Sequence, residues 1–172
     1  MYWPAEKLDH AEACRQEGDL SVQGARILLI EDDEALRELI ERNLSARHHA
    51  VSIAVDAQSA LRHLRTGTFD LIILDINLPD LSGWDVLRIA KREGHLQFPQ
   101  IDMQQEEKLP IVVVSAVRVS PRRMSEFRTR AYLPKPFPME ALLRLAVEAT
   151  EQKYCSILPA DRNPNASRPP QS

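Results

Sequence analysis

The chain has 172 residues, carries 22 basic and 25 acidic side chains for a net charge of −3, and is 44% hydrophobic. This length allows one domain with a sizeable core, and the weak negative charge gives no sign of a nucleic-acid-binding surface. No apolar run approaches the roughly 20 residues that span a bilayer, and the N-terminus lacks a secretory signal pattern. Cys14 and Cys155 lie outside the patterned core, which fits a reducing cytoplasm.

The two ends of the chain differ in composition from its middle. Residues 1–24 are polar and acidic with weak helical character, which predicts an N-terminal extension of at most one helix. Residues 153–172 are rich in proline, asparagine, serine and arginine and cannot bury enough apolar area, so we expect a disordered tail. The folded domain is therefore expected over residues 25–152.

Short apolar segments within this region predict five β-strands. Continuous apolar runs, such as residues 71–74, are typical of strands buried on both faces of a parallel sheet. The predicted strands are residues 26–30, 51–55, 69–74, 111–114 and 131–133.

Segments of helical periodicity lie between and after these strands. Apolar side chains gather on one face of each segment, with Leu39 and Val147 among those expected to face inward. Asp33 is placed to cap the first helix. Strands that alternate with helices predict a three-layer α/β domain with a parallel sheet. The predicted helices are residues 35–44, 58–65, 84–91, a segment of undefined length between 121 and 129, and residues 139–152.

Polar side chains follow four of the predicted strands. Glu31 and Asp32 follow the first strand, Asp75 the third, Ser115 the fourth and Lys135 the fifth. The carboxyl edge of an open α/β sheet is where ligands bind. Crowded carboxylates repel unless a cation neutralises them, and Mg²⁺ prefers such oxygen ligands. A carboxylate can attack phosphorus and a lysine can pair with phosphoryl oxygens, so the residues predict a site for a divalent metal and a phosphoryl group.

Each of these residues also has a simpler interpretation. The acidic run at residues 31–34 could be the first turn of a helix, where the helix dipole favours negative charge. Asp75 could cap the turn that follows it, and Tyr132 could be a half-buried strand residue. The coincidence of carboxylates on neighbouring strands favours the metal site.

Four motifs in this order make the chain resemble the receiver domain of two-component response regulators, over about residues 25–152. Together and at suitable spacing they are far more specific than any one of them. The motifs are ILLIEDDEALR at residues 27–37, LDINLPDLSG at 74–83, VSA at 114–116 and YLPKPF at 132–137.

The resemblance implies a flavodoxin-like fold with about five helices and strand order 2-1-3-4-5. It also implies that Asp75 accepts a phosphoryl group. Glu31, Asp32, Asp75 and the backbone carbonyl of Asn77 would hold Mg²⁺. Arg37 sets this register, because it lies five residues past Asp32, as the family's helix arginine usually does.

The resemblance gives roles to three further residues. Ser115 and Lys135 would act on the phosphoryl group, and Ser115 with Tyr132 would form the switch that transmits the signal. Two departures affect the output region: residues 83–110 are about ten residues longer than the family pattern, and residues 115–135 about two shorter.

The resulting hypothesis is a cytoplasmic, single-domain response regulator, similar to the chemotaxis regulators. Its donor would be a sensor histidine kinase or a histidine phosphotransfer protein. Its output partner is unknown, homodimerisation stays open, and neither a DNA-binding domain nor a membrane is expected. It would catalyse only its own phosphorylation and dephosphorylation. The alternatives are a receiver-like scaffold that works without phosphorylation, and a Mg²⁺-dependent phosphohydrolase with Asp75 as nucleophile, which Asn77 disfavours because an acid is needed there.

Overall fold

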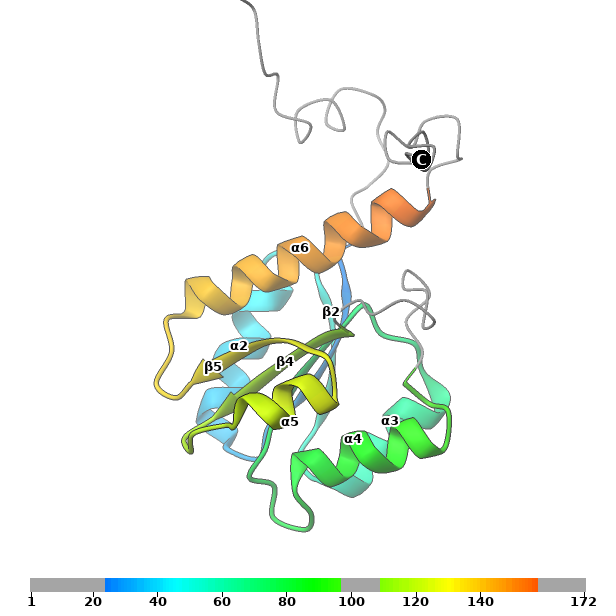
Figure 1. Ribbon diagram of the computed structural model, residues 1–172. Helices are drawn as coiled ribbons and strands as arrows, with labels where there is room; N and C mark the ends of the chain where they lie inside the picture. The colour runs from blue at the N-terminus through cyan, green and yellow to red at the C-terminus, as the bar shows by residue number, and fades with distance from the viewer. Residues whose placement is uncertain (1–23, 97–108, 158–172) are drawn as a thin grey trace, which may run out of the picture.

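A computed structural model describes residues 24–96 and 109–157 (Figure 1). No helix among these residues has the length and apolar character that crossing a bilayer requires. Strands and helices alternate along the chain, as predicted. The elements are β1 (Arg26–Ile30), α2 (Glu34–Ser45), β2 (Ala50–Ala54), α3 (Ala57–Thr66), β3 (Leu71–Asp75), α4 (Gly83–Arg92), β4 (Leu109–Ser115), α5 (Pro121–Glu126), β5 (Thr129–Pro134) and α6 (Met139–Ile157).

The five strands form one parallel sheet of order β2-β1-β3-β4-β5, which confirms the predicted topology. The register pairs Ile30 with Leu74 on the neighbouring strand, and Ser115 with Pro134. The carboxyl ends of β1, β3, β4 and β5 therefore lie along one edge of the sheet, which is the edge where open α/β sheets bind ligands.

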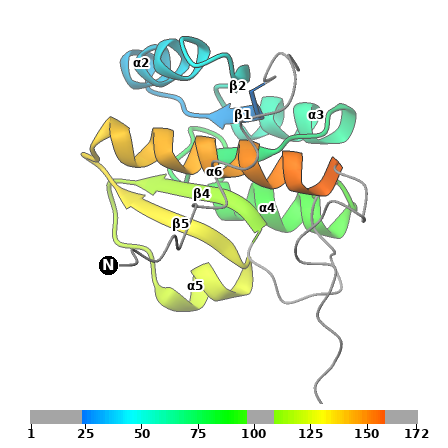
Figure 2. The same cartoon turned by 90° about the horizontal axis from the view of Figure 1, so that it is seen from above.

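Helices cover both faces of the sheet (Figures 1 and 2). Successive strand residues point to opposite faces. Leu28 and Ile30 thus pack with α3 and α4, whereas Ile27 and Leu29 pack with α2 and α6. All four are fully buried, and each contributes about 1.5–3 kcal/mol by leaving water. This three-layer core fixes the positions of the strand ends that carry the polar residues.

The ends of the helices test the predicted boundaries. Asp33 caps α2 as predicted, since its carboxylate accepts a hydrogen bond of 2.7 Å from the peptide N–H of Leu36. The last helix continues to Ile157, five residues beyond the predicted end at 152, so the expected disordered tail is wrong for residues 153–157. Residues 1–23 of the predicted extension and residues 158–172 lie outside the described residues.

Two predicted core positions are wrong. Leu39 on α2 is 51% exposed and Val147 on α6 is 45% exposed. Leu44 and Ala146, on the same two helices, are fully buried. Leu39 and Val147 lie at the margins of their apolar stripes, so the sheet covers only the centre of each stripe.

An aromatic pair links two helices on the α3–α5 face. The ring of Trp84, on α4, stacks on that of Phe127, which follows α5, with centroids 5.4 Å apart and planes inclined by 20°. Such pairs contribute about 0.5–1.5 kcal/mol beyond their buried area. The start of α4 is thereby tied to the junction of α5 and β5.

Candidate functional site

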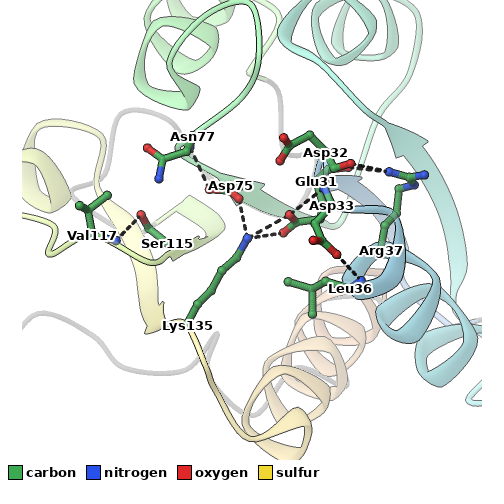
Figure 3. Close-up of polar contacts among 10 residues, drawn as sticks. All are labelled: Glu31, Asp32, Asp33, Leu36, Arg37, Asp75, Asn77, Ser115, Val117 and Lys135. Carbon is green, nitrogen blue, oxygen red and sulfur yellow. Dashed lines mark hydrogen bonds and ion pairs between the residues drawn. The ribbon is translucent and has the colours of Figure 1, made fainter.

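Lys135 joins two carboxylates at the carboxyl edge of the sheet (Figure 3). Its ammonium lies 2.9 and 2.8 Å from the two carboxylate oxygens of Glu31 and 2.5 Å from Oδ2 of Asp75. Glu31 directly follows β1, Asp75 is the last residue of β3, and Lys135 directly follows β5. The backbone N–H of Lys135 donates to the carbonyl of Ser115 at 2.9 Å, which holds the lysine at the strand ends.

Burial sets the electrostatics of this group. Glu31 is fully buried, and its desolvation raises the pKa of its carboxyl group above the ordinary value even though Lys135 acts against the rise. Desolvation by itself would lower the pKa of Lys135, but the hydrogen bonds and charges of Asp75 and Glu31 outweigh it, so the pKa is raised. The ammonium therefore stays charged at neutral pH and stabilises two buried acids.

One carboxylate oxygen from each of Glu31, Asp32 and Asp75 lies within 4.8 Å of the other two. The carboxylate of Asp32 is exposed to solvent, unlike the other two. A hard divalent cation prefers such oxygen ligands, so the donor set fits Mg²⁺. The backbone of Asn77 lies beside this cluster, because its N–H donates to Oδ1 of Asp75 at 2.9 Å. This bond makes Asp75 a cap of the turn that follows it, as the simpler interpretation of that residue expected.

Close packing of α4 against the end of β3 fixes the backbone at Asp75. A Cβ atom on Gly83 would lie 2.4 Å from the carbonyl oxygen of Asp75, so only glycine fits there without a shift of the backbone. The N–H of Gly83 donates to the carbonyl of Ile76 at 2.9 Å, and Asn77 pairs with Ser82 in an isolated bridge. The loop after Asp75 is thus folded tightly onto the strand end.

Asp80 anchors the same loop to another helix. Its carboxylate accepts hydrogen bonds from the N–H groups of Ala57 at 2.8 Å and Gln58 at 3.1 Å, the first two residues of α3. These bonds, led by that from Ala57, lower the pKa of Asp80. Asp80 lies within the motif LDINLPDLSG, but no role of its own was predicted for it. The hydrogen bond between Asp80 and Ala57 joins residues 23 positions apart, and no local sequence pattern predicts it.

Ser115 and Tyr132, the predicted switch pair, are linked through Val117. The buried hydroxyl of Ser115 accepts a hydrogen bond from the N–H of Val117 at 3.2 Å. The hydroxyl of Tyr132 donates to the carbonyl of the same residue at 3.0 Å. Tyr132 packs against the core cluster on the α3–α5 side and is only partly buried, as the simpler interpretation expected. Val117 was not singled out from the sequence.

The fold and the site define an α/β domain of the receiver type. The sequence profile of the response regulator receiver domain matches residues 27–147, a range that includes every candidate residue of the site. The chain therefore belongs to the response regulator receiver domain family, as its motifs predicted.

Curated relatives support this membership. Response regulator MprA of Mycolicibacterium vanbaalenii is 34% identical over 120 residues, which are 69% of this chain and 47% of that protein. Transcriptional activator protein PfeR of Pseudomonas aeruginosa is 33% identical over 125 residues, which are 72% of this chain and 37% of that protein. The chain thus matches about half the length, or less, of these relatives.

Solved structures share the fold. The receiver domain of sensor histidine kinase PA1611 from Pseudomonas aeruginosa PAO1, which has a magnesium ion in its active site cleft, is 26% identical, with a TM-score of 0.59 and coverage of 74% of this chain and 98% of that one. A CheY-like receiver domain protein from Methanospirillum hungatei is 25% identical, with a TM-score of 0.59 and coverage of 75% and 96%.

Proposed function

We propose that Asp75 accepts a phosphoryl group from a phosphohistidine of a sensor kinase or a phosphotransfer protein, and that the modification switches partner binding. The observation that carries the proposal is the bridge from Lys135 to Asp75 and Glu31 at the ligand-binding edge of the sheet. A cation already touches the acceptor carboxylate there, where the oxygens of an incoming phosphoryl group need positive charge.

The residues of the site divide the chemistry among them. A carboxylate oxygen of Asp75 forms a bond to phosphorus, the phosphorus–nitrogen bond of the donor breaks, and its electron pair returns to the imidazole, which then takes up a proton. Hydrogen bonds from Asn77 and Lys135 fix the orientation of the Asp75 carboxylate before the transfer. After the transfer, the ammonium of Lys135 can donate a hydrogen bond to one phosphoryl oxygen, and the hydroxyl of Ser115 can donate to another.

Mg²⁺ would be held by Glu31, Asp32, Asp75 and the backbone carbonyl of Asn77. When bound, it neutralises charge that the acidic residues and the phosphoryl oxygens bring together. Additional positive charge is needed there, because Lys135 contacts the carboxylates of Glu31 and Asp75 but not the third carboxylate, that of Asp32.

The proposal extends to the context of the domain. Its donor is a histidine kinase or a phosphotransfer protein, its output partner is a protein or a second copy of the chain, and it acts in the cytoplasm. It turns over no metabolite and catalyses only its own phosphorylation and dephosphorylation. A phosphohydrolase is disfavoured because the exposed residue two positions after Asp75 is Asn77, which cannot act as a general acid. A scaffold that works without phosphorylation would need Lys135 only to stabilise the buried Glu31, and it leaves the contact of Lys135 with Asp75 beside the exposed Asp32 carboxylate without a use.

Incubation of the full chain with acetyl phosphate and Mg²⁺, followed by intact mass measurement, tests the proposal. We expect one added phosphoryl group of about 80 Da, lost when the cation is chelated. Asp75→Asn should abolish the addition. Asp85→Asn, at a half-exposed aspartate on α4, is the matched control and should be labelled like the unsubstituted chain. Equal labelling of Asp75→Asn would overturn the assignment of the acceptor.

A further inference from the structure

We propose that Arg37 is a positioning residue of the metal site, because its guanidinium holds the backbone carbonyls of Glu31 and Asp32 and thereby fixes the loop that presents both carboxylates. The inference rests on the proposed function, in that it concerns the same cation. From the sequence, Arg37 served only to align the acidic residues with the family pattern, and no physical role was predicted for it.

The contacts of Arg37 are made to the backbone of the acidic loop. Its Nη1 donates to the carbonyl of Asp32 at 3.1 Å and to the carbonyl of Glu31 at 3.3 Å. Figure 3 shows Arg37 and Lys135 on opposite sides of this loop. One cation therefore contacts the backbone of the loop, and the other contacts its Glu31 side chain.

The two carbonyls lie between the regular elements. The sheet ladder ends where the N–H of Glu31 donates to the carbonyl of Ala54 at 3.0 Å, and the first helical bond runs from the N–H of Arg37 to the carbonyl of Asp33 at 2.9 Å. The carbonyls of Glu31 and Asp32 belong to neither ladder and need other partners. The side chain of Arg37, one turn into α2, folds back to provide them.

This arrangement fixes the direction of the Asp32 carboxylate. With two consecutive carbonyls held by one nitrogen, the peptide planes around Asp32 are set, and only its side-chain torsions stay free. The carboxylate of Asp32 is exposed, and the ammonium of Lys135 contacts the carboxylate of Glu31 instead. A cation near the start of a helix also faces the positive end of the helix dipole, which is unfavourable, so contact with the carbonyls is what stabilises Arg37 there.

Charge and positioning predict opposite effects of removing Arg37. Its positive charge lies near the acidic cluster and by itself repels Mg²⁺, so a charge-only role means that Arg37→Met binds Mg²⁺ more tightly. A positioning role means that the same variant binds Mg²⁺ more weakly, because the loop no longer holds Asp32 in place. Arg37→Lys keeps the charge and offers an ammonium as the N–H donor to the carbonyls, and under the positioning role it restores binding.

Calorimetric titration of the unphosphorylated full chain with Mg²⁺ distinguishes the positioning role of Arg37 from a charge-only role. We expect Arg37→Met to weaken Mg²⁺ binding on the order of tenfold, the lower end of the effect of residues that hold metal ligands in place. Arg37→Lys should recover most of this loss. Arg42→Met, which removes the same charge from an exposed position on the same helix, is the matched control and should bind like the unsubstituted chain.

Several outcomes would overturn the inference. Arg37→Met that binds Mg²⁺ as tightly as the unsubstituted chain, or more tightly, excludes a positioning role, and so does an equal loss in Arg42→Met. Failure of the unsubstituted chain to bind Mg²⁺ or to be phosphorylated would instead reject the proposed function. Circular dichroism of each variant, recorded before titration, ensures that only folded protein is compared.

Discussion

Lys135 contacts both carboxylate oxygens of Glu31, at 2.9 and 2.8 Å, across 104 residues of sequence. The contact stabilises a fully buried acid, which also accepts a hydrogen bond from the N–H of Asp33 at 3.3 Å, and it engages both oxygens that Glu31 would share with a cation. The exposed carboxylate of Asp32 is consequently the more accessible ligand of the acidic pair.

Lys135→Met should destabilise the chain in the absence of metal. Breaking a buried pair by removing one partner costs about 3–5 kcal/mol, and because the lysine side chain is 18% exposed we expect about 3 kcal/mol. Mg²⁺ should restore part of this loss, since it supplies positive charge to Glu31 and Asp75. Urea unfolding with and without Mg²⁺ measures both effects. A variant as stable as the unsubstituted chain would contradict this account of the bridge.

Asp32 and Asp33 are adjacent but should respond in opposite ways to substitution. Asp32→Ala should abolish Mg²⁺-dependent phosphorylation and leave the metal-free chain at least as stable, because it removes one of three crowded carboxylates. Asp33→Ala should keep the response to Mg²⁺ and lose about 1 kcal/mol of stability, because it removes the cap of α2. Acetyl phosphate labelling and urea unfolding of both variants check the contrast. If Asp32→Ala were phosphorylated as fast as the unsubstituted chain, the assignment of Asp32 as a metal ligand would be rejected.

Ser115 and Tyr132 should move together when Asp75 carries a phosphoryl group. The hydroxyl of Ser115 would turn toward the new oxygens and release the N–H of Val117, which loosens the hydrogen bond that the hydroxyl of Tyr132 donates to the carbonyl of Val117. Tyr132 should then turn toward the core. NMR spectra with and without the phosphoryl mimic beryllofluoride should show shifts at Tyr132 and over residues 121–145, and Ser115→Ala should suppress them. Shifts confined to the surroundings of Asp75 would disprove this switch.

Asp80→Ala should loosen the loop after the acceptor strand. The N–H groups of Ala57 and Gln58 would lose their acceptor, so their hydrogen exchange should quicken, with a loss of about 0.5–1 kcal/mol in stability. Asp80→Asn keeps an oxygen acceptor and should show a smaller effect. Asp85→Ala, on a half-exposed helical position, should leave the exchange of both amides unchanged. Unaltered exchange in Asp80→Ala would show that the loop is held by other contacts.

His49 should make the fold sensitive to mild acid. Burial lowers its pKa, the charges of Arg47 and His48 add to the effect, and its Nδ1 accepts a hydrogen bond from the N–H of Ala25 at 3.1 Å. The folded pKa lies below the unfolded value of 6.5, so stability is complete above that pH and decreases as the pH falls through it, by at most about 1.4 kcal/mol per pH unit.

Urea unfolding at about pH 7.5 and about pH 5.5, on either side of the ordinary histidine pKa, measures this loss. His49→Gln offers an oxygen acceptor to Ala25 without titrating, so it should reduce the loss of stability in acid. His63→Gln, on a half-exposed helical position, should retain the loss. An equal pH dependence in His49→Gln and the unsubstituted chain would assign the loss to other groups.

Patterns local in the sequence predicted much of the fold. The strand at residues 26–30 was placed with its correct ends, because a run of fully buried apolar residues leaves little choice of structure. Asp33 was recognised as a cap from its position alone. Leu39 and Val147 were misplaced because periodicity defines a stripe but not how much of it a neighbouring element covers.

The contacts of the site were harder to predict. The convergence of Asp75 and Lys135 follows from strand order, which the sequence did indicate. The contact of Lys135 with both oxygens of Glu31, and that of Asp80 with the start of α3, depend on how loops settle on a finished sheet. Such contacts join residues far apart in the chain, so no regular spacing in the sequence predicts them.

Trp84, which stacks on Phe127, provides an intrinsic fluorescence signal close to the site. Gly83, the residue before Trp84, packs directly against the backbone carbonyl of Asp75, so a new charge at Asp75 acts on the indole ring through a single residue. The sequence contains two tryptophans, Trp3 and Trp84. A Trp3→Phe variant would therefore emit from one indole next to the acceptor strand, and its fluorescence could follow cation binding and phosphoryl transfer in real time without a label.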